Sequence, residues 1–267
     1  MIRINDKKID MKHFPDGTML IKYLADNEST KITWLYDNDE EYMGIFFLVK
    51  HLRTHGVKKI ELFMPYIPNA RMDRVKNSDE VFTLKYFAEF INDFKFDSVE
   101  VLDPHSNVST ALIDNTSIIE PTDIILNLLE TVNSDGNTIL FFPDEGAMKR
   151  YSHIASKCDI PYVFGMKNRD WRSGEILGLE VLGETDAVPG KNILIIDDIC
   201  SRGGTFLHSA KALKAMGAAD IDLYVSHLEN SVWEGDMIRS GLVRNIYTTN
   251  SIYRFQDKGP VKVVKEY

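Results

Sequence analysis

Residues 192–205 constrain the fold more than any other stretch of this chain. Residues 193–196 form a continuous, largely β-branched apolar run, which predicts a buried central strand. The strand is expected to end on two carboxylates, Asp197 and Asp198, before a glycine loop and a helix with regularly spaced apolar residues. Glycines leave backbone N–H groups accessible, and a helix N-terminus favours anions. The stretch therefore predicts a phosphate-binding loop, with carboxylates that suit a ribose diol or a metal-bound ligand. The alternative is an ordinary strand-to-helix turn with a capping Ser or Thr.

Length and charge narrow the class of protein. The chain has 267 residues, enough for two domains, and its 44% hydrophobic and 27% charged residues are typical of a globular protein. A net charge of −9 argues against binding to nucleic acid or to an anionic membrane. Cys158 and Cys200 are too few for a disulfide framework, and no apolar run has signal-peptide or membrane-spanning length. We expect a cytoplasmic protein.

Strands alternate with helices along the chain, which predicts an α/β fold with mostly parallel sheets. Residues 59–105 and 191–227 each follow a strand, loop, helix, strand order and each end on a histidine. We therefore expect two stacked domains, at 1–133 and 134–267, divided near the polar stretch 131–136. The active site is expected between them, at the carboxyl ends of the strands.

Several segments resemble known proteins. Asp-Asp-Ile-Cys-Ser-Arg-Gly-Gly-Thr at 197–205 resembles the loop of the phosphoribosyltransferase fold that binds phosphoribosyl pyrophosphate (PRPP), where two acids hold the ribose hydroxyls. Other segments resemble the ribose-phosphate pyrophosphokinase (PRPP synthetase) family: Phe-Pro-Asp-Gly at 14–17, Pro-Tyr-Ile-Pro-Asn-Ala-Arg-Met-Asp-Arg at 65–74, Leu-Asp-Pro-His at 102–105, Pro-Asp-Glu-Gly at 143–146 and Lys-Asn-Arg at 167–169. The order and spacing match from about residue 14 to 229, and agreement across so many segments is specific.

The resemblance implies two tandem phosphoribosyltransferase-like domains, the first binding ATP and the second ribose phosphate. It implies transfer of the β,γ-diphosphoryl group of ATP to the 1-hydroxyl of ribose 5-phosphate with Mg²⁺, in a homo-oligomer of at least two subunits. The implied residues are Lys167, Arg169 and His105 for catalysis; Phe14, Asp16, Arg71, Asp73 and Arg74 for ATP; His105 and Asp144 for the metal; and Asp197, Asp198, Ser201, Arg202, Gly203, Gly204 and Thr205 for ribose and phosphate. Phe14 and Asp16 are expected to reach ATP in a neighbouring subunit.

Elementary chemistry agrees with these roles. Diphosphoryl transfer depends on positioning and on cationic stabilisation of phosphate oxygens, which arginine forks and a lysine supply. Magnesium needs few carboxylates, several waters and substrate phosphates. Composition alone, however, favours a solvated loop for Arg71 and Arg74 and a basic surface turn for Lys167 and Arg169. By position alone, His105 is equally a structural histidine or a ligand.

Departures from the family pattern leave the acceptor open. Thr18 replaces a glutamate and Met72 a glutamine, which affects adenine recognition, while Ser201 replaces an acid and Arg202 a threonine. The altered loop makes ADP-ribose, which virus-encoded relatives are thought to pyrophosphorylate, an alternative acceptor. Two other functions are weaker. A PRPP-consuming phosphoribosyltransferase would leave the ATP-side cations without a role, and a silent regulatory homologue would be expected to lose the acidic pair or the Lys167–Arg169 pair.

Overall fold

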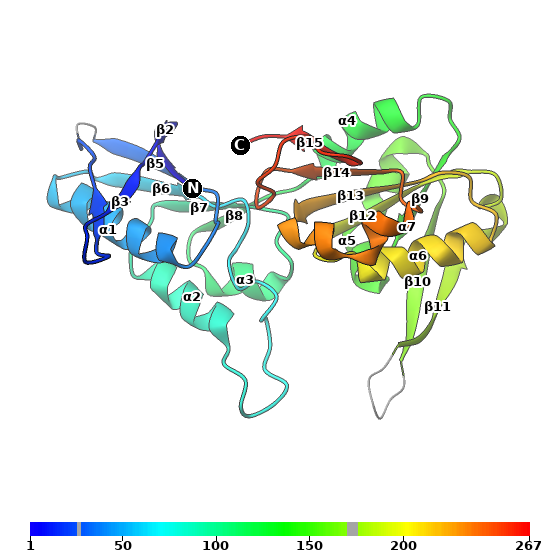
Figure 1. Ribbon diagram of the computed structural model, residues 1–267, viewed down its shortest axis with the longest axis horizontal. Helices are drawn as coiled ribbons and strands as arrows, with labels where there is room; N and C mark the ends of the chain where they lie inside the picture. The colour runs from blue at the N-terminus through cyan, green and yellow to red at the C-terminus, as the bar shows by residue number, and fades with distance from the viewer. Residues whose placement is uncertain (26–27, 170–175) are drawn as a thin grey trace. The chain divides into compact units, whose positions relative to one another are not determined.

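The protein is described here by a computed structural model that covers residues 1–25, 28–169 and 176–267; side chains at 167–177 lie outside the description. The chain forms two compact units, Met1–Glu120 and Pro121–Tyr267 (Figure 1). None of the helices in the described part of the chain has the length and apolar character needed to cross a membrane.

The first unit contains a sheet of six described strands in the order β2-β1-β5-β6-β7-β8. Strands β5 to β8 are parallel, and β1 pairs antiparallel with both β2 and β5. Strands β3 and β4 form a separate antiparallel hairpin. The elements in chain order are β1 (Ile2–Ile4), β2 (Lys7–Lys8), β3 (Met11–His13), β4 (Met19–Ile21), β5 (Ser29–Trp34), α1 (Glu40–Thr54), β6 (Lys59–Phe63), α2 (Thr83–Asn92), β7 (Ser98–Leu102), α3 (Asn107–Leu112) and β8 (Thr116–Ile119).

The second unit contains a sheet of seven described strands in the order β11-β10-β9-β12-β13-β14-β15. All neighbours are parallel except β10 and β11, which form an antiparallel pair. Its elements are α4 (Thr122–Val132), β9 (Thr138–Phe142), α5 (Glu145–Cys158), β10 (Tyr162–Arg169), β11 (Ile176–Gly183), β12 (Asn192–Cys200), α6 (Gly204–Ala215), β13 (Ile221–Leu228), α7 (Asp236–Ser240), β14 (Asn245–Thr249) and β15 (Val261–Lys265), with short 3-10 helices at Thr185–Ala187 and Asn230–Glu234.

The apolar run in β12 is explained by two cores, one on each face of this sheet. Ile193 and Ile195 pack in a cluster with residues of α6, whereas Leu194 and Ile196 pack in a second cluster with residues of α4 and α5. Alternate side chains of a strand point to opposite faces, so a strand covered on both sides must be apolar throughout. The prediction of a buried central strand in a mostly parallel α/β sheet is confirmed.

One expectation about an element was wrong. Strand β12 does not end at the acidic pair; it continues to Cys200 because its pairing with β13 extends to Leu228. Further along the chain, the extended backbone of Gly235 separates the 3-10 turn Asn230–Glu234 from α7. The last strand, β15, pairs with β14.

The division between the units falls before α4 rather than after it. Helix α4 contributes Ile125, Leu128 and Leu129 to a core of the second unit, so it belongs there by packing. The functional assignment of domains 1–133 and 134–267 stays a prediction.

Candidate active site

The acidic pair lies where β12 extends beyond its neighbour β9. Pairing of β12 with β9 ends at Ile195, while pairing with β13 continues through Asp197. Asp198 is buried, at 6% exposure, and Asp197 is half-buried with its Oδ1 accepting from the Asp198 N–H at 2.9 Å. Burial, with the charges of Asp198 and Asp144 adding to it, raises the pKa of Asp197 well above its usual value. Two carboxylates are thus held close together at the carboxyl end of a central strand.

Asp144 lies beside this pair at the start of α5. It follows β9, which neighbours β12, and its side chain caps the helix by accepting from the Ala147 N–H at 3.1 Å. Helix α5 also carries Arg150, whose Nη1 lies 3.9 Å from Oδ1 of Asp198. The structure therefore brings together three predicted acids, Asp144, Asp197 and Asp198, and adds a cation that sequence reasoning missed.

The glycine loop (residues 201–204) joins β12 to α6. Gly203 has φ +79°, and a Cβ there would lie 2.7 Å from the Met237 sulfur, so this turn requires glycine. Helix α6 begins at Gly204, which puts the free N–H groups of its first turn, including that of Thr205, next to the loop. Such a turn can bind an anion, which is the geometry that the sequence predicts for Ser201 to Thr205.

Residues 229–237, which follow β13, pack against this loop. The hydroxyl oxygens of Ser201 and Ser231 lie 3.1 Å apart, and the Arg202 guanidinium donates to Glu234 at 2.9 Å. A Cβ on Gly235 would lie 1.8 Å from the Arg202 carbonyl oxygen, so the two backbones are in close contact. Sequence reasoning missed these partners because they lie about 30 residues downstream and no spacing signal connects them to the loop.

In the first unit, Phe14 and Asp16 lie in the turn between β3 and β4. Phe14 is 49% exposed, while Asp16 accepts from both the backbone N–H and the hydroxyl of Thr18, at 2.9 and 2.7 Å. These bonds lower the pKa of Asp16, the side-chain bond most. Thr18, which departs from the family pattern, therefore serves to hold the turn.

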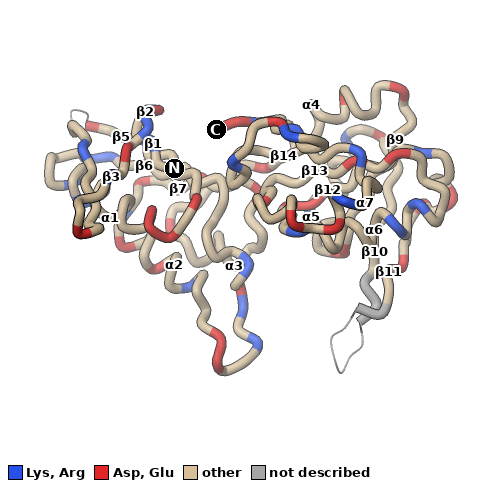
Figure 2. The backbone as a smooth tube through the Cα atoms, in the orientation of Figure 1, with Lys and Arg blue, Asp and Glu red and all other residues tan. Residues whose placement is uncertain are grey.

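The predicted ATP segment follows β6, and His105 follows the adjacent strand β7. Two backbone bonds join the strand ends: Met64 N–H donates to Glu100 at 2.9 Å, and Leu102 N–H donates to Pro65 at 3.1 Å. Arg71 and Arg74 are exposed, Arg74 Nε lies 3.5 Å from the Asp73 carboxylate, and His105 is half-buried. The loop between β6 and α2 carries both basic and acidic residues (Figure 2). Arg71, Asp73 and Arg74 thus lie in the loop that follows the carboxyl end of β6, and His105 follows the carboxyl end of the adjacent strand β7.

An aromatic cluster holds the start of that loop. Asn69 donates to the Tyr42 hydroxyl at 2.9 Å, and the rings of Tyr42 and Trp34 are 5.5 Å apart, edge to face. Burial raises the pKa of Tyr42 to about 12, so the hydroxyl that Asn69 contacts stays protonated at neutral pH. The segment before Arg71 is therefore anchored to α1.

The backbone of Lys167 and Arg169 lies in β10, but their side chains fall outside the description.

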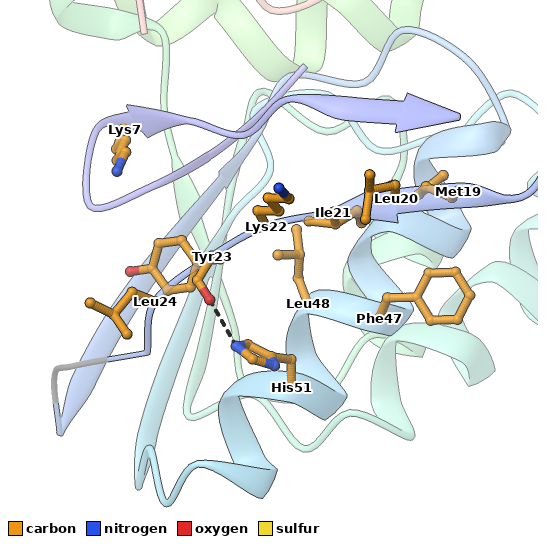
Figure 3. A pocket seen from close by; sticks show the side chains of 10 residues that line it. All are labelled: Lys7, Met19, Leu20, Ile21, Lys22, Tyr23, Leu24, Phe47, Leu48 and His51. Atoms are coloured by element: carbon orange, nitrogen blue, oxygen red, sulfur yellow. Dashed lines mark hydrogen bonds between the residues drawn. The ribbon is translucent and has the colours of Figure 1, made fainter. Parts of the chain in front are cut away.

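Two cavities described in the first unit are lined by none of the predicted site residues. The larger, about 710 Å³, lies between the β3–β4 hairpin and α1, and Met19, Ile21, Phe47 and Leu48 contribute apolar walls (Figure 3). His51 Nε2 donates to the Tyr23 carbonyl at 3.0 Å. Among the described residues, no group of three or more His, Cys, Asp or Glu side chains is arranged to hold a metal ion.

The chain is similar in sequence to several known proteins. Residues 113–242 match the model of the phosphoribosyl transferase domain. The ribose-phosphate pyrophosphokinase of Saccharolobus solfataricus is 26% identical over 250 residues, which cover 92% of this chain and 84% of that protein. That of Thermococcus kodakarensis is 27% identical over 251 residues, covering 92% of this chain and 86% of that protein.

The crystal structure of phosphoribosylpyrophosphate synthetase from Mycobacterium smegmatis superposes with a TM-score of 0.77 at 17% identity, covering 97% of this chain and 86% of that one. The fold and the acidic glycine loop define an α/β protein of the phosphoribosyltransferase type. The chain is thus similar to ribose-phosphate pyrophosphokinases over about nine-tenths of its length.

Proposed function

We propose that this protein transfers the β,γ-diphosphoryl group of ATP to the 1-hydroxyl of ribose 5-phosphate, giving PRPP and AMP. The observation that carries the proposal is the acidic pair followed by a glycine loop at a helix N-terminus, in a chain whose relatives are ribose-phosphate pyrophosphokinases. Carboxylates accept from the ribose diol, and backbone N–H groups donate to the 5-phosphate. A cytoplasmic location and assembly into a homo-oligomer stay predictions.

The proposed binding and activation of ATP depend on cationic residues of the first unit and on Lys167 and Arg169 in β10. Arg71 and Arg74 are exposed and can form paired hydrogen bonds with phosphate oxygens. His105 follows the neighbouring strand, so it can act on the same triphosphate. We assign Lys167 and Arg169 to the transferring phosphorus, where charge develops as the bond to the leaving phosphate lengthens.

The described residues contain no set of three metal ligands, so we assign magnesium to one or two carboxylates of the second unit together with substrate phosphates and waters. Asp197 is crowded by the charges of Asp198 and Asp144, and a divalent cation relieves such crowding. Asp144 is the residue we assign to the metal there, and His105 the one in the first unit. When bound, Mg²⁺ supplies charge neutralisation to the triphosphate oxygens.

ADP-ribose is the second candidate acceptor, and Arg202 is the observation that favours it. Its guanidinium is exposed and held by Glu234 at 2.9 Å, in a position where the family pattern has a threonine. A guanidinium can hold a phosphodiester as well as a terminal phosphate. Assaying both acceptors at equal concentration decides between them.

The test is release of AMP from ATP with Mg²⁺, measured with and without ribose 5-phosphate. The proposed reaction requires AMP and PRPP in equal amounts, and only when the acceptor is present. If neither acceptor elicits AMP, the chain is a transferase that consumes PRPP or a silent homologue. Adding PRPP with a nucleobase then separates those two, because only the transferase releases pyrophosphate.

A further inference from the structure

Residues 229–237 contact the last residue of β12, Cys200, and the first three positions of the glycine loop that the proposed function assigns to the ribose phosphate. Glu229 N–H donates to the Cys200 carbonyl at 2.8 Å. Ser231 bonds Ser201, Glu234 bonds Arg202, and Met237 lies where a side chain on Gly203 would be. We call residues 229–237 the support segment. A loop whose backbone N–H groups bind an anion needs such outside support, because glycines give it little rigidity of its own.

The hydrogen bonds at Ser201 have a definite direction. Ser231 Oγ donates to the Glu229 carboxylate at 3.0 Å, and a hydroxyl has one proton to give. Ser231 must therefore accept at its other contact, the 3.1 Å contact with Ser201. The proton of Ser201 consequently points toward Ser231, and Ser231 in turn donates to Glu229.

We infer that Ser231 and Glu229 are positioning residues for the ribose phosphate, acting through Ser201, and that the Ser201 hydroxyl does not itself donate to the phosphate. The inference rests on the proposed function for its ligand. In this arrangement the Ser201–Ser231–Glu229 relay fixes the start of the glycine loop. The phosphate is then held by the backbone N–H groups of the loop and of the first turn of α6, together with the side chains that follow Ser201.

Hydrogen–deuterium exchange of the free, full-length protein tests the positioning without any substrate. Ser231→Ala should speed exchange of the amides at 201–205, and Ser231→Thr, which keeps the hydroxyl, should restore wild-type exchange. The matched control is Thr138→Val, which removes another hydroxyl of the second unit at the opposite, amino end of β9, where it donates to the Val132 carbonyl at 3.0 Å. Equal exchange in Ser231→Ala and wild type would overturn the inference.

Binding of ribose 5-phosphate, measured by calorimetry, tests the direction of the relay. Ser231→Ala and Ser201→Ala should each weaken binding about fivefold to thirtyfold, and the double variant should be no weaker than either, because all three break the same relay. The KM for ATP should not change. If Ser201→Ala weakens binding while Ser231→Ala binds like wild type or tighter, then Ser201 donates directly to the phosphate and the inference is wrong. If the wild-type protein binds no ribose 5-phosphate, the proposed function is wrong. The positioning role of the support segment is still decided by the exchange experiment, which uses no substrate.

Discussion

At the scale of single residues, the charged carboxylate of Asp197 lowers the stability of the folded protein. Burial and the charges of Asp198 and Asp144 raise its pKa, so the folded protein holds that proton more tightly than the unfolded chain does. The stability of the wild-type protein should therefore fall as the pH rises above about 4, the ordinary aspartate value, toward the raised folded value. A carboxylate kept in such a place is what a ligand-binding role requires.

Asp197→Asn should consequently stabilise the free protein while weakening acceptor binding. We expect the free energy of unfolding at pH 7 to rise by about 1 kcal/mol, and the gain to disappear below about pH 4, where the wild-type carboxyl is protonated in both states. Affinity for ribose 5-phosphate should fall at least about tenfold, since a diol hydroxyl loses its carboxylate. Denaturant unfolding across pH and calorimetry measure the two effects. Exposed Asp93→Asn is the control, and a destabilised Asp197→Asn at pH 7 would contradict the electrostatic argument.

Lys167 and Arg169 are assigned to the transition state, so their loss should change turnover rather than substrate binding. Lys167→Ala or Arg169→Ala should lower kcat about a hundredfold, equivalent to about 3 kcal/mol of transition-state stabilisation. The Kd of ribose 5-phosphate should stay near the wild-type value. Steady-state kinetics with calorimetry separate the two quantities; an increase in KM at unchanged kcat would show that these cations bind the ground state instead.

At the scale of elements, the sequence predicts features that depend on local residue pattern but not features that depend on pairing between distant segments. The continuous apolar run predicted β12 as a buried strand, and the buried Leu84, Phe87, Ala88 and Ile91 of α2 likewise recur at helical spacing in the sequence. The end of β12 was not predicted, because its length is set by pairing with β13, and pairing tolerates acids at a strand end. The break at Gly235 was equally hidden, since its cause is the Arg202 backbone, a contact distant in sequence.

The two neighbouring glycines of the loop should respond differently to alanine. Gly203→Ala should lower the free energy of unfolding by about 1–3 kcal/mol, because φ +79° is strained for alanine and its methyl would displace Met237. At Gly204 a Cβ meets nothing within 4 Å, and this residue begins α6, so Gly204→Ala should be neutral or stabilising by up to about 1 kcal/mol. Chemical denaturation of both variants makes the comparison, and similar losses in the two would show that the loop conformation is not what requires glycine.

At the scale of the whole molecule, the sequence predicted two α/β units and the order of their strands and helices along most of the chain. It placed the division after α4, whereas packing assigns α4 to the second unit through Ile125 and Leu129. The residues of the candidate site likewise fall into those that the sequence pattern predicts and those that only the fold brings together. The contiguous residues 197–205 could be found from their pattern, but Arg150, Ser231 and Glu234 reach that segment only through the fold. The spacing of residues along the sequence gives no signal for a contact that exists only in the tertiary structure.

At the same scale, the turn between β3 and β4 predicts that the protein assembles into at least a dimer. Phe14 is 49% exposed at the tip of the β3–β4 hairpin, and it is expected to reach ATP in a neighbouring subunit. If so, Phe14→Ala on one subunit and Asp198→Asn on its partner fall in the same site of a mixed dimer and leave the other site intact. In a mixed dimer, the site on the Phe14→Ala subunit receives an intact Phe14 from its partner and keeps its own Asp198.

Co-expression of these two variants, each nearly inactive alone, should therefore restore activity. Random pairing of equal amounts leaves about a quarter of all sites intact, so AMP release should approach a quarter of the wild-type rate. If Phe14 serves its own subunit, each site in a mixed dimer carries one lesion, and no activity returns. Sedimentation of the mixture and of each variant establishes that subunits have paired, because a chain that is active as a monomer at assay concentration would contradict the prediction by itself.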